Sequence, residues 1–301
     1  MIPRNESQFS TELTLGNKQL FFENKKQRQF TGKIVLQFVL IVMAILILLP
    51  FYWMIVNSLK GIEEFFNPKT TLLPLKGSLA NYFQLFQHTQ YVNWFANSVI
   101  VSVLTLVLGM LICSMAGFAL AVYQFKGKNV LFWAVLGSVA IPEIVTIIPV
   151  FKLMVAMQMI DTYYSLVLPY SMNVFGIFLM KQFIASNLPP ELLEAARIDG
   201  ASEFGIYFRI SLPLIKPGLG VLGIYLWLHS WSSYFWPLIM LKSSGMLTVP
   251  LGLATLYADP WNLQYGMLMA GAFLSTIPII IIFLLAQEQF IAGLTGGAVK
   301  G

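Results

Sequence analysis

The chain has 301 residues, of which 57% are hydrophobic and 10% are charged, and its formal net charge is +5. Soluble domains carry about 25% charged residues, so this composition excludes an ordinary soluble globular domain. Several apolar runs approach the length of about 20 residues that a helix needs to cross a bilayer. We therefore expect an all-α integral membrane protein that is embedded in the lipid bilayer.

The N-terminal segment 1–32 is mostly polar and mixed in charge. It lacks the short apolar core and the small-residue cleavage site of a secretory signal, so we expect a retained cytoplasmic tail. The single cysteine, Cys113, lies inside an apolar run. It predicts neither a disulfide nor a metal centre, and a small packing residue is its expected role.

Run length predicts six membrane-spanning helices in one membrane domain over 33–290. The first run is uninterrupted, whereas the later ones contain Gly and Pro, which membrane helices tolerate. The spans are expected at 33–57, 94–122, 129–151, 163–183, 217–240 and 265–286. A short cytoplasmic tail over 291–301 is expected to follow them.

The positions of the basic residues predict the orientation of these spans. Most of the 18 Lys and Arg residues fall in segments that share a side with the N-terminus. Because basic residues are retained on the cytoplasmic side, both termini are expected to lie in the cytoplasm. The excess of basic over acidic residues therefore reflects membrane topology, and no nucleic-acid partner is needed to explain it. The two long outer segments, 58–93 and 241–264, are either docking surfaces for an external partner or simple connections.

The cytoplasmic segment 184–216 carries the clearest pattern. Pro189 and Pro190 suit the first turn of a helix, where a missing amide hydrogen costs nothing. Gly200 offers a stop after an apolar stretch. A second short helix is expected at 201–209, ending before Pro213. From the residues alone, this elbow is either an amphipathic hairpin that covers the membrane surface or an insert for a groove on another protein.

The same segment resembles the signature loop of membrane subunits of binding-protein-dependent ABC importers. It reads E-x-x-E-A-A-x-x-D-G-A from Glu191, followed with relaxed spacing by the stretch from Phe208 to Pro217. Other stretches resemble the sugar-importer branch that includes the maltose-type permeases. They are 141–154, 161–170, 175–183, 231–241 and 293–301. The resemblance runs from about Ile34 to the end of the chain.

This resemblance implies a type I ABC importer permease fold, with six transmembrane helices and a cytoplasmic coupling-helix elbow. In such importers the elbow docks in a cleft of the ATPase subunit and transmits its closure to the membrane helices. The residues expected to carry this coupling are Glu191, Glu194, Ala195, Ala196, Asp199, Gly200 and Ala201. In the tail, Gly296, Gly297 and Lys300 are expected either to reach toward the ATPases or to form a frayed terminus.

The resemblance also implies a set of partners in a bacterial-type plasma membrane. They are a second permease subunit, expected to be a different chain, two ATPase subunits and an extracytoplasmic solute-binding protein. ATP and Mg would bind to the ATPases, and this chain would bind no cofactor. Consistently, the sequence contains no G-x-x-x-x-G-K-[ST] phosphate loop. It also contains no H-E-x-x-H or G-x-S-x-G motif, so no catalytic residue or metal ligand is predicted.

Candidate solute contacts lie within the spans. Glu143, between Pro142 and Pro149, either lines a water-filled pathway or caps a broken helix. Amides, hydroxyls and aromatic faces match the surfaces of a sugar, but the same residues also serve in packing. The remaining candidates are Asn173, Trp231, Ser232, Tyr234 and Trp236. His88 and His229 show no partner spacing, so a structural or exposed role is expected for both.

The predicted function is therefore import of a sugar or oligosaccharide through a channel-forming permease subunit, with sugar-phosphate-like polyols as the second choice of solute. A stand-alone secondary carrier of a small polar solute is the alternative. Such a carrier is expected to show internal repeats or more membrane-buried charge. Neither is visible in the sequence.

Overall fold

A computed structural model describes residues 6–65, 72–257 and 264–295, and within these ranges the fold is all-α. The chain divides into two compact units, Met1–Val56 and Asn57–Gly301. The first consists of most of helix α1 (Glu6–Ser58), whose part from Gly32 onward is long and apolar enough to cross a membrane. Pro50 lies inside this helix.

The second unit contains the remaining candidate spans. Three pass the length and composition test directly, namely α4 (Tyr91–Val122), the pair α7 (Tyr163–Ser171) with α8 (Val174–Asn187), and α15 (Tyr265–Thr295). Two bent helix pairs each form a further candidate span. Among the described residues, four helices are thus long enough to cross a membrane, or up to six when each bent pair is one span.

The third predicted span, 129–151, is not one straight helix. Lys128–Ala140, which comprises α5 (Lys128–Gly137) and the short η1 (Ser138–Ala140), meets α6 (Glu143–Ala156) at 106°. Pro142 causes the break, because it has no amide hydrogen to continue the helical ladder and forces the preceding residue toward extended backbone. Ile141 accordingly has φ −82° and ψ 117°.

The fifth predicted span, 217–240, is also divided. Helix α12 (Lys216–Trp231) ends well before residue 240, and the chain turns through Ser232 and Ser233 into the short α13 (Phe235–Met240). On its other side, α12 meets the stretch Glu203–Leu214 at 81°. This stretch comprises α10 (Glu203–Gly205), the π-helical η2 (Ile206–Ser211) and α11 (Leu212–Leu214).

Helix α4 is the central element of the second unit, and it packs against α7, α8 and α12, while α12 also packs against α15. Small residues bring these helices close together, as is usual in membranes. A Cβ added to Gly117 would lie 2.7 Å from Met180 Cβ, and one added to Gly176 would lie 2.9 Å from Cys113 Sγ. Cys113 is fully buried as a free thiol, which agrees with its expected packing role.

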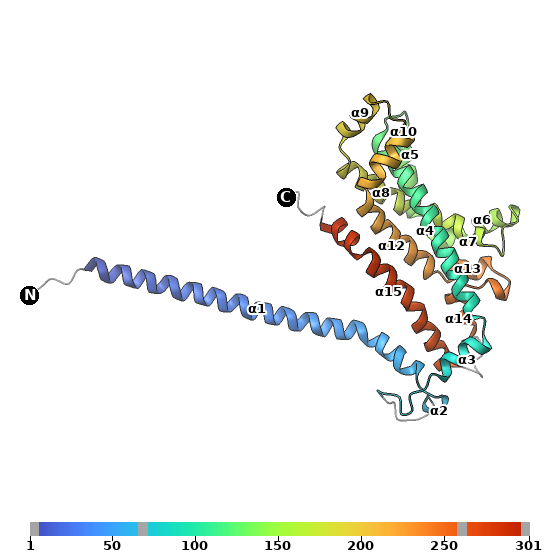
Figure 1. The fold of residues 1–301 in the computed structure, drawn as a ribbon, viewed down its shortest axis with the longest axis horizontal. Helices are drawn as coiled ribbons and strands as arrows, with labels where there is room; N and C mark the ends of the chain where they lie inside the picture. The colour runs from blue at the N-terminus through green and yellow to red at the C-terminus, as the bar shows by residue number, and fades with distance from the viewer. Residues whose placement is uncertain (1–5, 66–71, 258–263, 296–301) are drawn as a thin grey trace, which may run out of the picture. The chain divides into compact units, whose positions relative to one another are not determined.

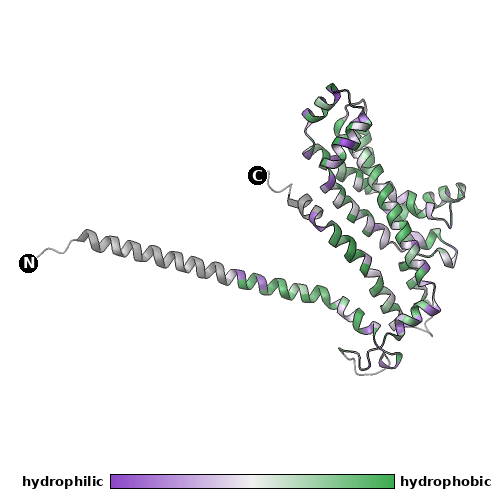
Figure 2. Cartoon of the chain, in the orientation of Figure 1, coloured by the Kyte–Doolittle hydropathy of each residue, from purple (hydrophilic) through white to green (hydrophobic). Residues whose placement is uncertain are grey.

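Shorter helices cover the two ends of the second unit. Figure 1 places α9 (Pro190–Ile198) and α10 at one end, and α2 (Ile62–Phe65), α3 (Ala80–His88) and α14 (Val249–Thr255) at the other. Between α13 and α14 lies the 3-10 helix η3 (Ser244–Met246). In Figure 2 hydrophobic residues follow α4 and α15, and hydrophilic residues gather at the α9–α10 turn.

Candidate functional site

The turn between α9 and α10 has a defined backbone geometry. Pro190 lies in the first turn of α9, and Glu191 lies near the positive end of the helix dipole. At the other end, Gly200 has φ +77°, and its amide bonds Arg197 O at 3.1 Å while the amide of Ala201 bonds Ala196 O at 3.0 Å. These two bonds form a Schellman motif, which favours glycine at the left-handed position.

The predicted elbow residues divide into one buried side chain and an exposed set. Ala196 is buried beside Leu193 in the core of the second unit, so these two residues fasten α9 to the helices beneath it. The other predicted residues are exposed, namely Glu191, Glu194, Ala195, Asp199, Gly200 and Ala201. Two large apolar side chains are exposed with them: Ile198 at 86% and Phe204 at 68%. The elbow therefore presents an uncovered apolar surface at one end of the second unit.

A hydrogen-bonded triad connects the elbow to the end of α4. Glu203 accepts hydrogen bonds from Arg197 Nε at 2.8 Å and from the Tyr123 hydroxyl at 2.6 Å. The bond to Glu203 raises the pKa of Arg197 above its usual range. Burial, with a further contribution from Glu203, raises the pKa of Tyr123 to about 12, so this hydroxyl stays protonated and donates.

The second arm of the elbow is held by the core. Ile206 and Tyr207 are buried, and the Tyr207 hydroxyl shares a hydrogen bond of 2.6 Å with Ser114 of α4. The prediction that this arm ends before Pro213 is wrong. Pro213 lies in α11, which continues directly from the π-helical η2, and the break comes at Ile215.

A cavity of about 430 Å³ lies where α6, α7, α12 and α13 meet. Its polar lining comes from the broken helix ends. Four of the six predicted solute residues line it: Glu143, Ser232, Tyr234 and Trp236. Glu143 is the first residue of α6, directly after the break at Pro142. Its side chain is exposed and lines the cavity, so the residue has both of the expected positions. Trp236 is fixed by a hydrogen bond of 2.9 Å from its Nε1 to Ser165 O.

The other two predicted solute residues have structural contacts and are not among the residues that line this cavity. Asn173 caps α8, because its Oδ1 accepts from the Gly176 amide at 2.8 Å. Trp231 is buried, stacks on Trp227 at 5.5 Å and donates from Nε1 to Ser275 O at 3.0 Å.

A model of the family described as "Binding-protein-dependent transport system inner membrane component" matches residues 109–295, which include the elbow and the cavity. The chain belongs to this family. It is a permease subunit of an ABC importer, with its ATPase on a separate chain, and a multi-pass protein of the inner membrane.

Two of the similar relatives are named as arabinooligosaccharide permeases, and a third is named for another solute. The arabinooligosaccharides transport system permease protein AraQ of Halalkalibacterium halodurans is 43% identical over 80% of this permease and 84% of the relative. The protein of the same name from Bacillus subtilis is 40% identical over 89% of this permease and 96% of the relative. The sn-glycerol-3-phosphate transport system permease protein UgpE of Brucella abortus is 32% identical over 85% of this permease and 93% of the relative.

A solved structure agrees with the type I permease fold. A chain of a bacterial ABC transporter involved in the import of the acidic polysaccharide alginate matches with a TM-score of 0.75. It is 21% identical, and the match covers 85% of this permease and 95% of that chain. At this identity the likeness bears on the fold alone.

Among the residues of the permease cavity that sequence reasoning missed are Tyr170 and His229. The Tyr170 hydroxyl shares a hydrogen bond of 2.6 Å with Ser233, and its ring lies 4.6 Å from that of His229, edge to face. His229 also stacks on Tyr225 at 5.9 Å. Its position, two residues before Trp231 and near the end of α12, is the signal that could have included it.

The predicted tail residues Gly296, Gly297 and Lys300 lie outside the described residues. Within the described ranges, no group of three or more His, Cys, Asp and Glu side chains is arranged to hold a metal ion.

Proposed function

We propose that this permease imports a sugar or an oligosaccharide that a separate extracytoplasmic protein delivers. The observation that carries the proposal is the similarity, over at least 80% of the chain, to two permeases named for arabinooligosaccharides. The cavity supports it chemically. Tyr170, Tyr234 and Trp236 offer aromatic surface, and Ser232 and His229 offer hydrogen-bonding groups suited to sugar hydroxyls.

The elbow is proposed as the site where a partner ATPase acts on this chain. An exposed apolar surface that includes Ile198 and Phe204 is typical of an interaction site, because burying it in a partner is favourable. The contact must differ between the open and closed ATPase, since equal binding to both states shifts nothing. Glu191, Glu194, Ala195, Asp199, Gly200 and Ala201 would contact the ATPase, with Ala196 holding α9 in place.

Force applied at the elbow has a physical route into the membrane helices. The buried Leu193, Ala196 and Tyr207 belong to one core cluster with residues of α4, α8 and α12. Closely packed clusters transmit displacement because they do not deform continuously. The route therefore supports rocking of α4, α8 and α12 when the ATPases close, and α12 is one of the helices that line the cavity.

The assembly would contain this permease, a second and different permease, two ATPases that bind ATP and Mg, and a solute-binding protein. Both termini would lie in the cytoplasm. The tail residues Gly296, Gly297 and Lys300 would reach toward the ATPases. The distribution of Lys and Arg along the sequence supports this orientation.

Affinity purification of the tagged chain from its native membrane, followed by mass spectrometry, tests the assembly. Recovery of an ATPase, a second permease and a sugar-binding protein is the expected result. Recovery of this chain alone, in a detergent that preserves related complexes, would overturn the partner set and favour a stand-alone carrier. Uptake of radiolabelled arabinotriose by cells with and without the chain tests the solute class.

A further inference from the structure

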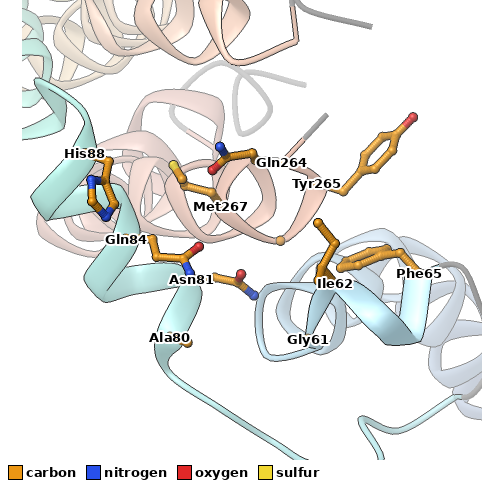
Figure 3. Close-up of a pocket in the computed structure, with 11 residues that line it drawn as sticks. Gly61, Ile62, Phe65, Ala80, Asn81, Gln84, His88, Gln264, Tyr265 and Met267 are labelled. Carbon is orange, nitrogen blue, oxygen red and sulfur yellow. The ribbon is translucent and has the colours of Figure 1, made fainter. Parts of the chain in front are cut away.

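We propose that a second cavity, far from the elbow, holds a neutral saccharide on the outer face of the permease. The cavity has a volume of about 400 Å³ and lies between α2, α3 and the start of α15 (Figure 3). Its lining includes residues of both predicted outer segments, 58–93 and 241–264, for which the sequence indicated either docking surfaces or simple connections. This inference rests on the proposed import of sugar and on the proposed orientation.

One wall of the cavity is a single face of α3. Asn81, Gln84 and His88 are spaced by three and four residues, so they share one side of the helix. Figure 3 shows these three side chains along α3, with Ile62 and Phe65 on the opposite side of the cavity. Gln264 and Tyr265, where α15 begins, complete the lining.

The base of this wall is fixed before any ligand arrives. Asn81 Nδ2 donates to Ser58 O and to Lys60 O, each at 2.8 Å. Gly266 allows the side chain of Asn81 to approach closely, because a Cβ at this glycine would lie 2.4 Å from Nδ2. A wall held in this way loses little conformational freedom on binding, which favours affinity.

The lining matches a sugar in both polar and apolar character. The amides of Gln84 and Gln264 both donate and accept hydrogen bonds, as sugar hydroxyls do, and His88 adds a ring nitrogen. Phe65 and Tyr265 are stacked at 5.9 Å with 30° between their rings, which provides apolar surface for the C–H face of a sugar ring. The volume lies within the range of about 300–1,000 Å³ for small-molecule sites.

The charge of the lining selects a neutral ligand. Among the described residues that line the cavity there is no Asp, Glu, Lys or Arg. The nearby Glu64 is engaged elsewhere, because it accepts hydrogen bonds from the amides of Leu75 at 2.9 Å and Lys76 at 3.2 Å. A charged saccharide would lose hydration here with no opposite charge to offset the loss.

Cysteine protection tests the proposal in right-side-out membrane vesicles that contain the whole transporter and are washed free of binding protein. The Gln84→Cys variant places a thiol in the cavity, and Gln87→Cys places one on the same helix, exposed but outside the lining. The only native cysteine, Cys113, is buried and gives a low background. A membrane-impermeant maleimide is applied with arabinotriose, with maltotriose or with the charged trimer trigalacturonate.

A neutral trimer is expected to slow modification of the Gln84→Cys variant, by about tenfold at about ten times its dissociation constant. Gln87→Cys is expected to react at an unchanged rate, and trigalacturonate is expected to protect neither variant. Labelling that no trimer slows, protection only by added binding protein, or absence of labelling from outside would each overturn the proposal. Arabinotriose uptake by the Gln84→Cys strain is measured in parallel, so failure of sugar import is distinguished from failure of this site.

Discussion

The hydroxyl of Tyr123 donates a hydrogen bond of 2.6 Å to Glu203, across 80 positions of sequence. Tyr123 is the C-terminal cap residue of α4, and Glu203 is the first residue of α10. Because Arg197 of α9 donates to the same carboxylate, one acidic side chain connects both arms of the elbow to the central helix. The elbow is therefore fastened to α4 by a polar contact as well as by its buried residues.

Removing the Tyr123 hydroxyl is expected to loosen the elbow without unfolding the protein. A hydrogen bond at a partly exposed site contributes about 1 kcal/mol, or about fivefold in a population. In Tyr123→Phe, the ratio of solute uptake to ATP hydrolysis should fall by up to about this factor. Tyr164→Phe, at an exposed tyrosine of α7, is the control. An unchanged ratio in Tyr123→Phe would remove the triad from the coupling route.

Gly200→Ala is expected to uncouple ATP hydrolysis from uptake. Its φ of +77° costs a residue with a Cβ about 1–2 kcal/mol, and the proposed docking surface lies at this turn. Gly127→Ala is a matched control, because Gly127 has φ +87° and both glycines have open space around a Cβ. ATPase and uptake assays of the two variants separate the effects. Equal loss of coupling in both would assign the effect to backbone strain.

Tyr234→Ala is expected to weaken solute passage through the cavity of α6, α7, α12 and α13. Loss of an aromatic contact costs about 0.5–1.5 kcal/mol, so the KM for uptake should rise by up to about tenfold. Membrane insertion should be unchanged, since 41% of this side chain is exposed. Tyr164→Ala is the control, because Tyr164 does not line this cavity. Equal KM values for both variants would exclude Tyr234 from the pathway.

Gly117→Ala tests the close contact between α4 and α8. The added methyl group would lie 2.7 Å from Met180 Cβ and 2.8 Å from the backbone nitrogen of Lys181. Forcing the helices apart is expected to cost about 1–3 kcal/mol, seen as a lower thermal midpoint in detergent. Gly137→Ala, which meets nothing within 4 Å, should be neutral or slightly stabilising. A midpoint unchanged by Gly117→Ala would show that the two helices separate without cost.

The contact between Asp161 and the loop at Lys242 and Ser243 is expected to weaken in acid. Burial opposes the charged form, but hydrogen bonds from the amides of Lys242 and Ser243 and from the Ser243 hydroxyl hold the pKa of Asp161 below its usual value. The stabilisation is therefore present above about pH 4 and is lost as the pH falls through the lower pKa of the folded state.

Hydrogen exchange of the Lys242 and Ser243 amides, corrected for intrinsic rates, measures this contact. Protection is expected at about pH 5 and should decline as the pH falls below the usual pKa of an aspartate, about 4. In Asp161→Asn, which carries no titrating carboxyl group, the protection should be lower at about pH 5 and independent of pH across this interval. The same pH dependence in the variant and in the parent would assign the effect to other groups.

Much of the fold could be predicted because it depends on local properties of the chain. The apolar runs give the spans by length, and the pattern from Pro189 to Gly200 gives α9 and its turn. The error in the third span was not local in origin. Pro142 bends the third span because the effect of a proline inside an apolar run depends on whether neighbouring helices accept a kink or a break.

The candidate sites were predicted less completely, since their residues come together from distant segments. Trp231 and Trp236 belong to one short aromatic stretch, yet the first is packed beside Trp227 and the second lines the cavity. Composition cannot separate them. Their roles depend on where α12 ends and α13 begins, which long-range packing decides.

The sequence by itself determined that this is a membrane permease with a helical elbow between two of its spans, because hydrophobic length and turn residues act over a few positions. Only the tertiary structure decided which side chains meet. It buried Ala196 and exposed Ile198 on the same short helix, and it brought Tyr123 to Glu203. The physical reason is that these outcomes depend on how helices far apart in sequence pack, and no local pattern contains that information.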